Sequence, residues 1–104
     1  MASPLPGVNL MVLLKELSDA LRADVIEVLS REALEELTEA TLNVILGNIP
    51  SSPEQLRSLR RHKQDLLELT GAKTSEARSK ELLQNGGLFR SVARAVENVW
   101  YPQI

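Results

Sequence analysis

The sequence predicts an all-α protein, built as a compact bundle of five or six short helices. Apolar residues recur at spacings of three and four along most of the chain, which is the period of a half-buried helix. Serines and prolines precede these apolar runs and glycines follow them, and both are typical helix boundary signals. No stretch alternates apolar and polar residues with β-branched enrichment, so no strand is predicted.

Composition supports a helical fold and excludes several kinds of site. The chain has 104 residues, enough for one modest domain, and 43% of them are apolar but only 3% are aromatic. The core must therefore be aliphatic, a composition that favours helices. The absence of cysteine excludes disulfides, thiolate catalysis and zinc sites of the finger type.

The sequence also allows a prediction of where the protein is located. No apolar run approaches the roughly 20 residues that a membrane span needs. The start, MASPLPGVNLMVLL, has no basic region ahead of its short apolar run, so no signal peptide is predicted. We expect an intracellular or particle-enclosed protein that is neither secreted nor transmembrane.

Charge is unevenly distributed along the chain. The net charge is -2, but residues 1–50 carry three cations against eight anions (-5) and residues 51–104 carry nine against six (+3). Either the two halves face each other, or only the second half meets a polyanion. We expect an N-terminal arm at 1–8 and one helical domain at 9–104. Within that domain we expect an acidic part at 9–50, a basic hairpin at 52–85 and a C-terminal helix at 87–101.

Two helical signals precede residue 30. Asn9 is the expected N-cap of a short helix to residue 17, and Ser18 begins a second signal that runs to residue 29. They could form one bent helix or two. The expected inward positions are Leu10, Leu13, Leu14 and Leu17 in the first signal and Leu21, Val25, Val28 and Leu29 in the second.

A third helix is expected from the N-cap Ser30 to residue 46. Gly47 is the expected left-handed C-cap, and Pro50 prevents continuation. The inward stripe comprises Leu34, Leu37, Thr41, Val44 and Ile45, and the glutamates Glu32, Glu35, Glu36 and Glu39 lie largely away from it.

The segment Ser52-Pro53-Glu54-Gln55 has the residues of a capping box with proline at the first helical position. It predicts one helix over 53–70, ended by Gly71, with these residues near one face: Leu56, Leu59, Leu66, Leu67 and Thr70.

Thr74 or Ser75 is expected to cap the next helix, which carries Ala77, Leu82 and Leu83. Asn85-Gly86-Gly87 is expected to end it through positive φ at glycine. A last helix over 88–100 turns Val92, Ala95, Val96 and Val99 inward.

The string LNVILGNIPSSPEQLRSLRRHKQDLLELTGAKTSEARSKELLQNGGLF resembles a segment of small accessory (protein X-like) proteins of Maverick/Polinton and adintovirus-type DNA elements. The matching parts are Leu42, Asn43 and Val44; Gly47, Asn48 and Pro50; 59–63; Lys73 and Ser75; Lys80, Leu82 and Leu83; and Gly86, Gly87 and Leu88. The resemblance spans 42–88, just under half the chain. It implies a virion accessory protein, comparable to the small basic core or membrane-active protein of adenoviruses.

The chain departs from that pattern in two places. Glu76 and Glu81 interrupt Arg78 and Lys80, where the relatives are much richer in lysine and arginine. The relatives' long apolar tail is replaced here by an ordinary amphipathic helix. We therefore expect a non-enzymatic helical interaction or structural protein of a virus-like element, which associates with itself as a homo-oligomer or binds another protein.

A cationic cluster gives the main alternative, weak nucleic-acid binding. Arg57, Arg60 and Arg61 stand at i, i+3 and i+4 on one helical face, where they could follow a phosphate backbone. The full candidate set is Arg57, Arg60, Arg61, Lys63, Lys73, Arg78 and Lys80. A solvated face, or pairing with the glutamates of 30–46, is the other interpretation. The lack of neighbouring aromatics disfavours single-strand recognition.

No candidate for catalysis, metal or cofactor binding stands out, so an enzyme is not expected. His62 is the sole histidine and has only Asp65 near it in helical spacing, so we expect it at the edge of the core. The four glutamates of 30–46 lack histidine partners. Asn85-Gly86-Gly87 lacks the lysine and preceding strand of a phosphate loop, although amides at the start of the last helix could hold an anion.

The C-terminal helix is the other candidate surface. Trp100 and Tyr101 either close the bundle or anchor a partner. The candidate protein interface comprises Leu88, Phe89, Val92, Val96 and Trp100. A second alternative function, activity at a membrane surface, would use the same helix, although a membrane partner is not expected.

Overall fold

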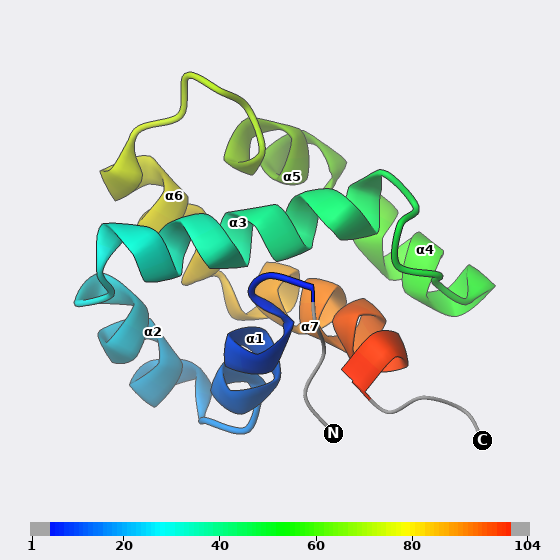
Figure 1. The fold of residues 1–104 in the computed structure, drawn as a ribbon, viewed down its shortest axis with the longest axis horizontal. Coiled ribbons are helices and arrows are strands. Elements are labelled where there is room, and N and C mark those ends of the chain that lie inside the picture. Colours follow the sequence, from blue (N-terminus) through cyan, green and yellow to red (C-terminus); the bar gives the residue numbers. More distant parts are fainter. Residues whose placement is uncertain (1–4, 101–104) are drawn as a thin grey trace.

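The computed structural model describes residues 5–100, without the side chain of Trp100, and consists of helices and the turns between them (Figure 1). The seven helices of this part are α1 (Val8–Lys15), α2 (Asp19–Glu27), α3 (Arg31–Ile45), α4 (Pro53–Arg60), α5 (Lys63–Leu69), α6 (Glu76–Leu83) and α7 (Gly86–Trp100). The predicted all-α class is confirmed. The expected number of five or six helices is too low because one expected helix is two.

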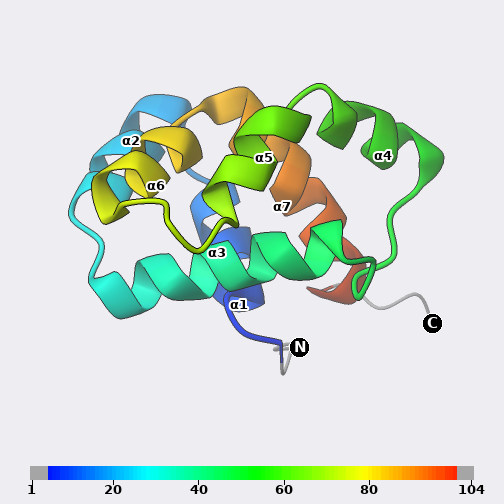
Figure 2. The same ribbon diagram turned by 90° about the horizontal axis from the view of Figure 1, so that it is seen from above.

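α7 is the central helix of the fold. It packs against α1, α3, α4 and α6, and Figure 2 shows α3 running along one side of the molecule. Its fully buried residues are Leu88, Phe89, Val92, Ala93, Ala95 and Val96. Val92, Ala95 and Val96 therefore point inward as predicted. The predicted protein interface is wrong for four of its residues, because they are buried in the core of this chain: Leu88, Phe89, Val92 and Val96. The side chain of Trp100, and Tyr101, lie outside the described residues.

Serine caps begin four of the helices. Ser18, Ser30, Ser52 and Ser75 each accept a hydrogen bond from the backbone N–H three residues later. The backbone N–H of Ser52 also donates to Oε1 of Gln55 at 2.8 Å, which completes the predicted capping box. These starts follow local rules and were predictable from the sequence.

Two glycines have positive φ, and only one of them was predicted. Gly47 has φ 80 after the last residue of α3, as expected of a left-handed C-cap. Gly7 has φ 77 and is the N-cap of α1, two positions before the expected N-cap Asn9. A Cβ on Gly7 would collide with the backbone oxygen of Glu36, so this glycine lets the chain lie directly against α3.

α1 consequently turns a different face inward from the one predicted. Its buried residues are Val8, Met11, Val12 and Leu14. Leu13, predicted to be inward, is 64% exposed, because the packing of α1 against both α3 and α7 selects the face with Val8 and Met11.

The expected helix over 53–70 is broken at Arg61 and His62. His62 has φ -110 and ψ 18, outside the helical region, and separates α4 from α5. The break has a tertiary cause: α4 packs against α7, whereas α5 packs against α6. One straight helix could not reach both partners, so the expected hairpin of two helices over 52–85 is instead three helices.

The expected positive φ at Gly86 and Gly87 is also wrong, because neither glycine is among the positive-φ residues. Asn85 separates the helices instead: its Oδ1 accepts a hydrogen bond from the backbone N–H of Leu88 at 3.2 Å. α7 therefore begins at Gly86.

A buried arginine ties α2 to the end of α1. Arg22 is only 3% exposed, and its guanidinium lies 4.8 Å from the centroid of the Phe89 ring. It donates to the backbone oxygens of Leu14 (3.0 Å), Lys15 (3.3 Å) and Leu17 (2.8 Å), and to Oδ1 of Asp19 (2.8 Å). One side chain thus donates to two carbonyls at the C-terminus of α1 and to the carbonyl of Leu17 in the turn that follows.

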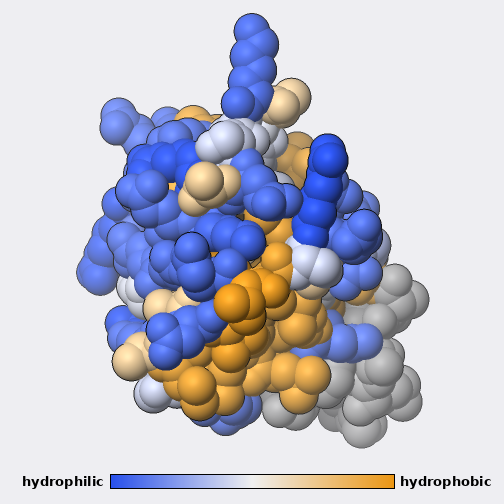
Figure 3. All heavy atoms as spheres, turned by 90° about the vertical axis from the view of Figure 1, so that its left-hand side faces the viewer, coloured by the Kyte–Doolittle hydropathy of each residue, from blue (hydrophilic) through white to orange (hydrophobic). Residues whose placement is uncertain are grey.

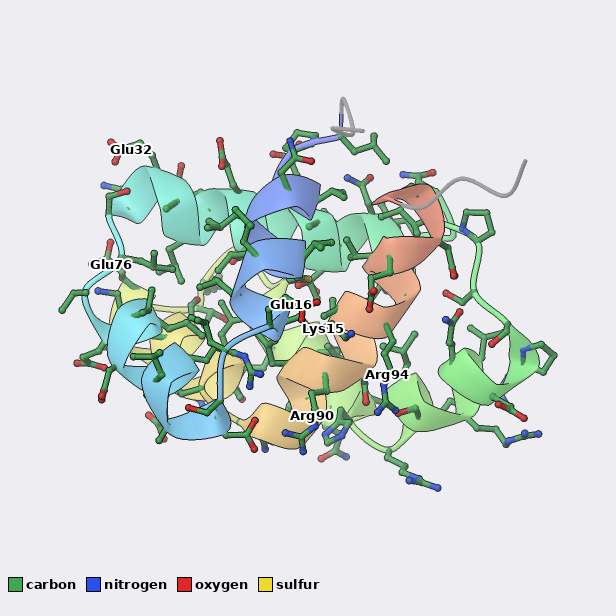
Figure 4. The ribbon with its side chains drawn as sticks, turned by 90° about the horizontal axis from the view of Figure 1, so that it is seen from below. Lys15, Glu16, Glu32, Glu76, Arg90 and Arg94 are labelled. Atoms are coloured by element: carbon green, nitrogen blue, oxygen red, sulfur yellow. The ribbon has the colours of Figure 1, made fainter. Side chains whose placement is uncertain are left out.

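Ion pairs extend this contact to α7. Asp19 accepts from Arg90 at 2.6 Å, and Lys15 lies 2.7 Å from Glu97. Figure 4 shows Lys15 beside α7, and Arg90 and Arg94 projecting from that helix. Both pairs join the acidic half of the chain to the basic half.

Candidate protein interface

An apolar groove opens between the end of α3, α4 and α5. It has a volume of about 210 Å³. Its lining comprises Val44, Ile45, Leu56, Leu59, Leu66 and Leu67, with the cations Arg60 and Lys63. We call this surface the α4–α5 groove.

The break between α4 and α5 explains why the groove exists. Leu59 and Leu66 are buried, but Leu56, Ile45 and Leu67 are exposed, the last at 54%. All five were predicted to face the core, so the prediction is wrong for three of them. With the helix broken, α4 directs Leu59 into the core and leaves Leu56 beside the groove, and α5 directs Leu66 and Leu69 into the core and leaves Leu67 beside the groove. Apolar residues gathered in an exposed groove are typical of an interaction surface.

The predicted cations fall into two groups. Five of them are exposed and make no ion pair within residues 5–100: Arg57, Arg60, Arg61, Lys63 and Lys73. The predicted ridge of three arginines is interrupted, since Arg61 is the C-cap of α4. None of the three pairs with the glutamates of α3.

Arg78 and Lys80 are instead engaged within the fold. Arg78 donates to both carboxylate oxygens of Glu68, at 2.7 and 3.0 Å, and to Glu81 at 3.0 Å. The Arg78 hydrogen bonds lower the pKa of Glu68. Lys80 donates to the backbone oxygen of Glu27 at 2.9 Å. The candidate cationic set is therefore not one continuous surface.

A second apolar surface lies on α2. Leu21 and Val28 are exposed, Val28 at 80%, and Val25 between them is half-buried. Figure 3 shows apolar surface gathered on the side of the molecule where α2 lies, with hydrophilic side chains around it. The prediction that Leu21 and Val28 face inward is wrong because Arg22 and Ile26 occupy the buried side of α2. We call Leu21, Asp24, Val25, Glu27 and Val28 the α2 face.

The two surfaces lie at opposite ends of the molecule. Figures 1 and 2 place α2 at one end of the longest axis and α4 at the other. That axis has an extent of 38 Å. The α2 face and the α4–α5 groove of one molecule are therefore too far apart to cover each other.

The remaining candidate residues lie as follows. His62 is half-buried, and a Cβ on Gly87 would lie 3.5 Å from its ring. Glu32, Glu35, Glu36 and Glu39 are exposed on α3, and Arg31 pairs with Glu35 at 3.2 Å. Within residues 5–100, no three histidine or carboxylate side chains are grouped as a metal ion would require. Among the helices described, none has both the length and the apolar content to cross a membrane.

Comparison with protein-family models, curated proteins and solved structures finds no match to this chain. The resemblance of residues 42–88 to accessory proteins of virus-like elements thus stays an expectation. The candidate interface rests on the geometry of the groove and of the α2 face.

Sequence reasoning located part of this surface. Arg60 and Lys63 were predicted as exposed nucleic-acid-binding residues, and both line the groove. The apolar part was missed because helical spacing assigned Leu56 and Leu67 to the core. One available signal was the run Arg60-Arg61-His62-Lys63, since four consecutive basic residues disfavour an uninterrupted buried face.

Proposed function

We propose that this chain is a non-enzymatic protein-interaction module, and that the α4–α5 groove receives the apolar face of an amphipathic helix. The observation that carries the proposal is the groove itself, where leucines from two helices stand exposed beside two unpaired cations. Apolar grooves of this kind bind helices through residues spaced at i, i+4 and i+7.

The cations indicate which helix the groove prefers. Arg60 and Lys63 line it, and Arg57 lies one turn before Arg60 on α4. No carboxylate is among the lining residues, so these charges have no local counterpart. A helix with carboxylates beside its apolar stripe would gain favourable long-range attraction and a defined orientation. The ligand class is therefore an acidic amphipathic helix.

The resemblance of residues 42–88 supports the same kind of function. The segment includes the whole of α4, α5 and α6, and contains every groove residue. A structural or accessory protein of a virus-like element would use such a groove to bind another protein chain.

A peptide titration tests the proposal. A fluorescent helical peptide with leucines at i, i+4 and i+7 and glutamates beside them is titrated with the protein, and its anisotropy is measured. The variant Leu67→Glu places a charge at the apolar wall and should weaken binding by about tenfold or more. Lys63→Glu should weaken it by about two- to fivefold.

Two controls decide the outcome. Leu13→Glu changes a leucine on α1 that is at least as exposed as Leu67 but lies outside the groove, and it should leave binding unchanged. A peptide with lysine in place of glutamate should bind more weakly than the acidic one. Equal binding to Leu67→Glu and the unmodified protein, or no binding at millimolar concentration, would overturn the proposal.

A second candidate function, weak nucleic-acid binding, is favoured by the exposed cations that make no ion pair within residues 5–100: Arg57, Arg60, Arg61, Lys63 and Lys73. Contacts to phosphates should give a linear fall of log affinity with log salt concentration. Duplex DNA binding measured over a salt series tests this, and no binding at low salt removes the candidate. A membrane-surface function is less favoured, because the apolar face of α7 on which it would depend is buried.

A further inference from the structure

We infer that the occupant of the α4–α5 groove is the α2 face of a second copy of this chain, so that copies associate head to tail. This inference rests on the proposed function of the groove and names its partner. The two surfaces that it joins lie at the two ends of the fold, and each has exposed apolar residues.

The α2 face has the properties that the groove requires. Leu21 and Val25 stand four residues apart on α2, and Val28, three residues further on, is the C-cap of the helix, so the three continue one apolar stripe to the end of α2. Asp24 and Glu27 are exposed beside this stripe, and Oε2 of Glu27 accepts a hydrogen bond from Nε2 of Gln84 at 2.7 Å. Asp24 makes no hydrogen bond or ion pair within residues 5–100, which leaves it available to a cation of another molecule.

The charges favour contact between a groove and an α2 face over contact between two grooves or between two α2 faces. Two grooves facing each other would place Arg60 and Lys63 of one copy against the same cations of the other. Two α2 faces in contact would likewise oppose carboxylates. Only groove against α2 face brings opposite charges together, and like charges in contact cost binding free energy.

The position of the surfaces determines the kind of assembly. A contact between different surfaces is heterologous, and it leaves one free groove and one free α2 face at the two ends of each complex. Because these surfaces lie at opposite ends of the long axis, further copies can add in a row. The assembly therefore grows as an open chain, or closes as a ring if the rotation between copies permits.

The small contact area sets the expected strength. One helical stripe in a groove of about 210 Å³ makes an interface well below the standard size of stable complexes. We expect a dissociation constant on the order of 10 μM or weaker, so the mass in solution should rise with concentration.

A mixing experiment with two blocked variants tests the inference. Val28→Lys blocks the α2 face and leaves the groove open. Leu67→Glu blocks the groove and leaves the α2 face free. Both residues are largely exposed, so neither substitution should disturb the core, and thermal unfolding by circular dichroism verifies this. Sedimentation velocity is run on each variant alone and on the equimolar mixture, up to millimolar concentration.

The expected result is distinctive. The unmodified chain forms a concentration-dependent series of species, each blocked variant alone is a monomer, and the mixture forms a dimer and nothing larger. Leu13→Glu, outside both surfaces, associates as the unmodified chain does. A monomeric mixture, or association by either blocked variant alone at the level of the unmodified chain, would overturn the inference.

The inference and the proposed function can fail separately. If the unmodified chain stays monomeric but the acidic helical peptide still binds the groove, the self-association is wrong and the proposed function stands. If neither the peptide nor a second copy binds, both are wrong.

Discussion

Arg22 shows how a single charged residue organises this small fold. A buried guanidinium normally has a large desolvation cost, and it is tolerated only when its donors are satisfied. Here Arg22 donates to three carbonyls and one carboxylate, and its Cζ lies over the Phe89 ring. The end of α1, the start of α2 and the core helix α7 are therefore held together at one point.

Arg22→Met should be strongly destabilising. The substitution retains apolar volume near Phe89 but leaves the carbonyls of Lys15 and Leu17 without their donor, at a cost of about 3 kcal/mol in the free energy of unfolding. Urea denaturation measures it. Arg31→Met is the matched control, because Arg31 is 78% exposed in an i, i+4 pair, and it should cost less than about 0.5 kcal/mol. Equal effects of the two substitutions would contradict this role.

Asp19 should give the fold an acid sensitivity with a defined sign. Its hydrogen bond with Arg90, and secondly that with Arg22, lower its pKa below the ordinary 3.8. A carboxylate whose pKa is lower in the folded chain stabilises the fold above the ordinary pKa. That contribution is lost as the pH falls from 3.8 through the folded value.

Asp19→Asn should therefore be less stable than the unmodified chain at neutral pH, with a difference that narrows as the pH falls below 3.8. Urea midpoints measured over a pH series test this. Asp24→Asn, at a carboxylate on the same helix without a hydrogen bond in the described residues, should change stability little at any pH. A difference for Asp19→Asn that stays constant with pH would show that the ion pairs do not stabilise the fold.

At the scale of elements, the helix ends that depend on neighbouring residues could be predicted from the sequence. The face that each helix buries could not. The caps at Ser18, Ser30, Ser52 and Ser75 and the left-handed Gly47 depend on a few neighbouring residues. The buried face of α1 depends on which helices it meets, which lie far along the sequence. Helical spacing identifies a set of apolar positions but does not choose among overlapping stripes, so Leu13 was assigned to the core.

The break between α4 and α5 is the error with the largest consequence for the candidate site. Nothing local forbids a continuous helix over 53–70, because the stretch contains no glycine and no internal proline. Packing against α7 and α6 overrides this propensity. The groove could not be predicted without that break, although its two cations were.

The two positive-φ glycines allow an element-scale test. Gly7→Ala forces a Cβ against the backbone oxygen of Glu36 as well as into a left-handed conformation, so α1 must move away from α3. We expect a loss of about 3 kcal/mol or more in the free energy of unfolding. Gly47→Ala has the same φ penalty but no atom within 4 Å of the new Cβ, and should cost only about 1 kcal/mol. Similar melting temperatures for the two variants would contradict the close approach of α1 to α3.

At the scale of the whole molecule, the division of charge has two separate outcomes. Two ion pairs join the acidic and basic halves inside the fold: Lys15 with Glu97, and Asp19 with Arg90. Arg60 and Lys63 do not join in this pairing and face solvent beside exposed leucines. The first set stabilises one chain, whereas the second is available to another chain.

Charge-reversal substitutions on both surfaces distinguish electrostatic pairing of two copies from non-specific hydrophobic association. Lys63→Glu reverses a cation of the groove, and Asp24→Lys reverses an anion of the α2 face. Each variant alone should associate about two- to fivefold more weakly than the unmodified chain, because one attractive pair becomes repulsive.

In the equimolar mixture, the reversed groove of the first variant meets the reversed α2 face of the second, and opposite charges face each other again. Sedimentation velocity should therefore detect mixed dimers that form more tightly than either variant forms with itself. The contact between the unreversed groove and α2 face is restored as well, so longer alternating chains should follow at high concentration. Added salt should reduce the difference between mixture and single variants, because exposed charges are screened over about 10 Å at 0.1 M. A mixture no better associated than its components would mean that Asp24 and Lys63 do not meet across the contact.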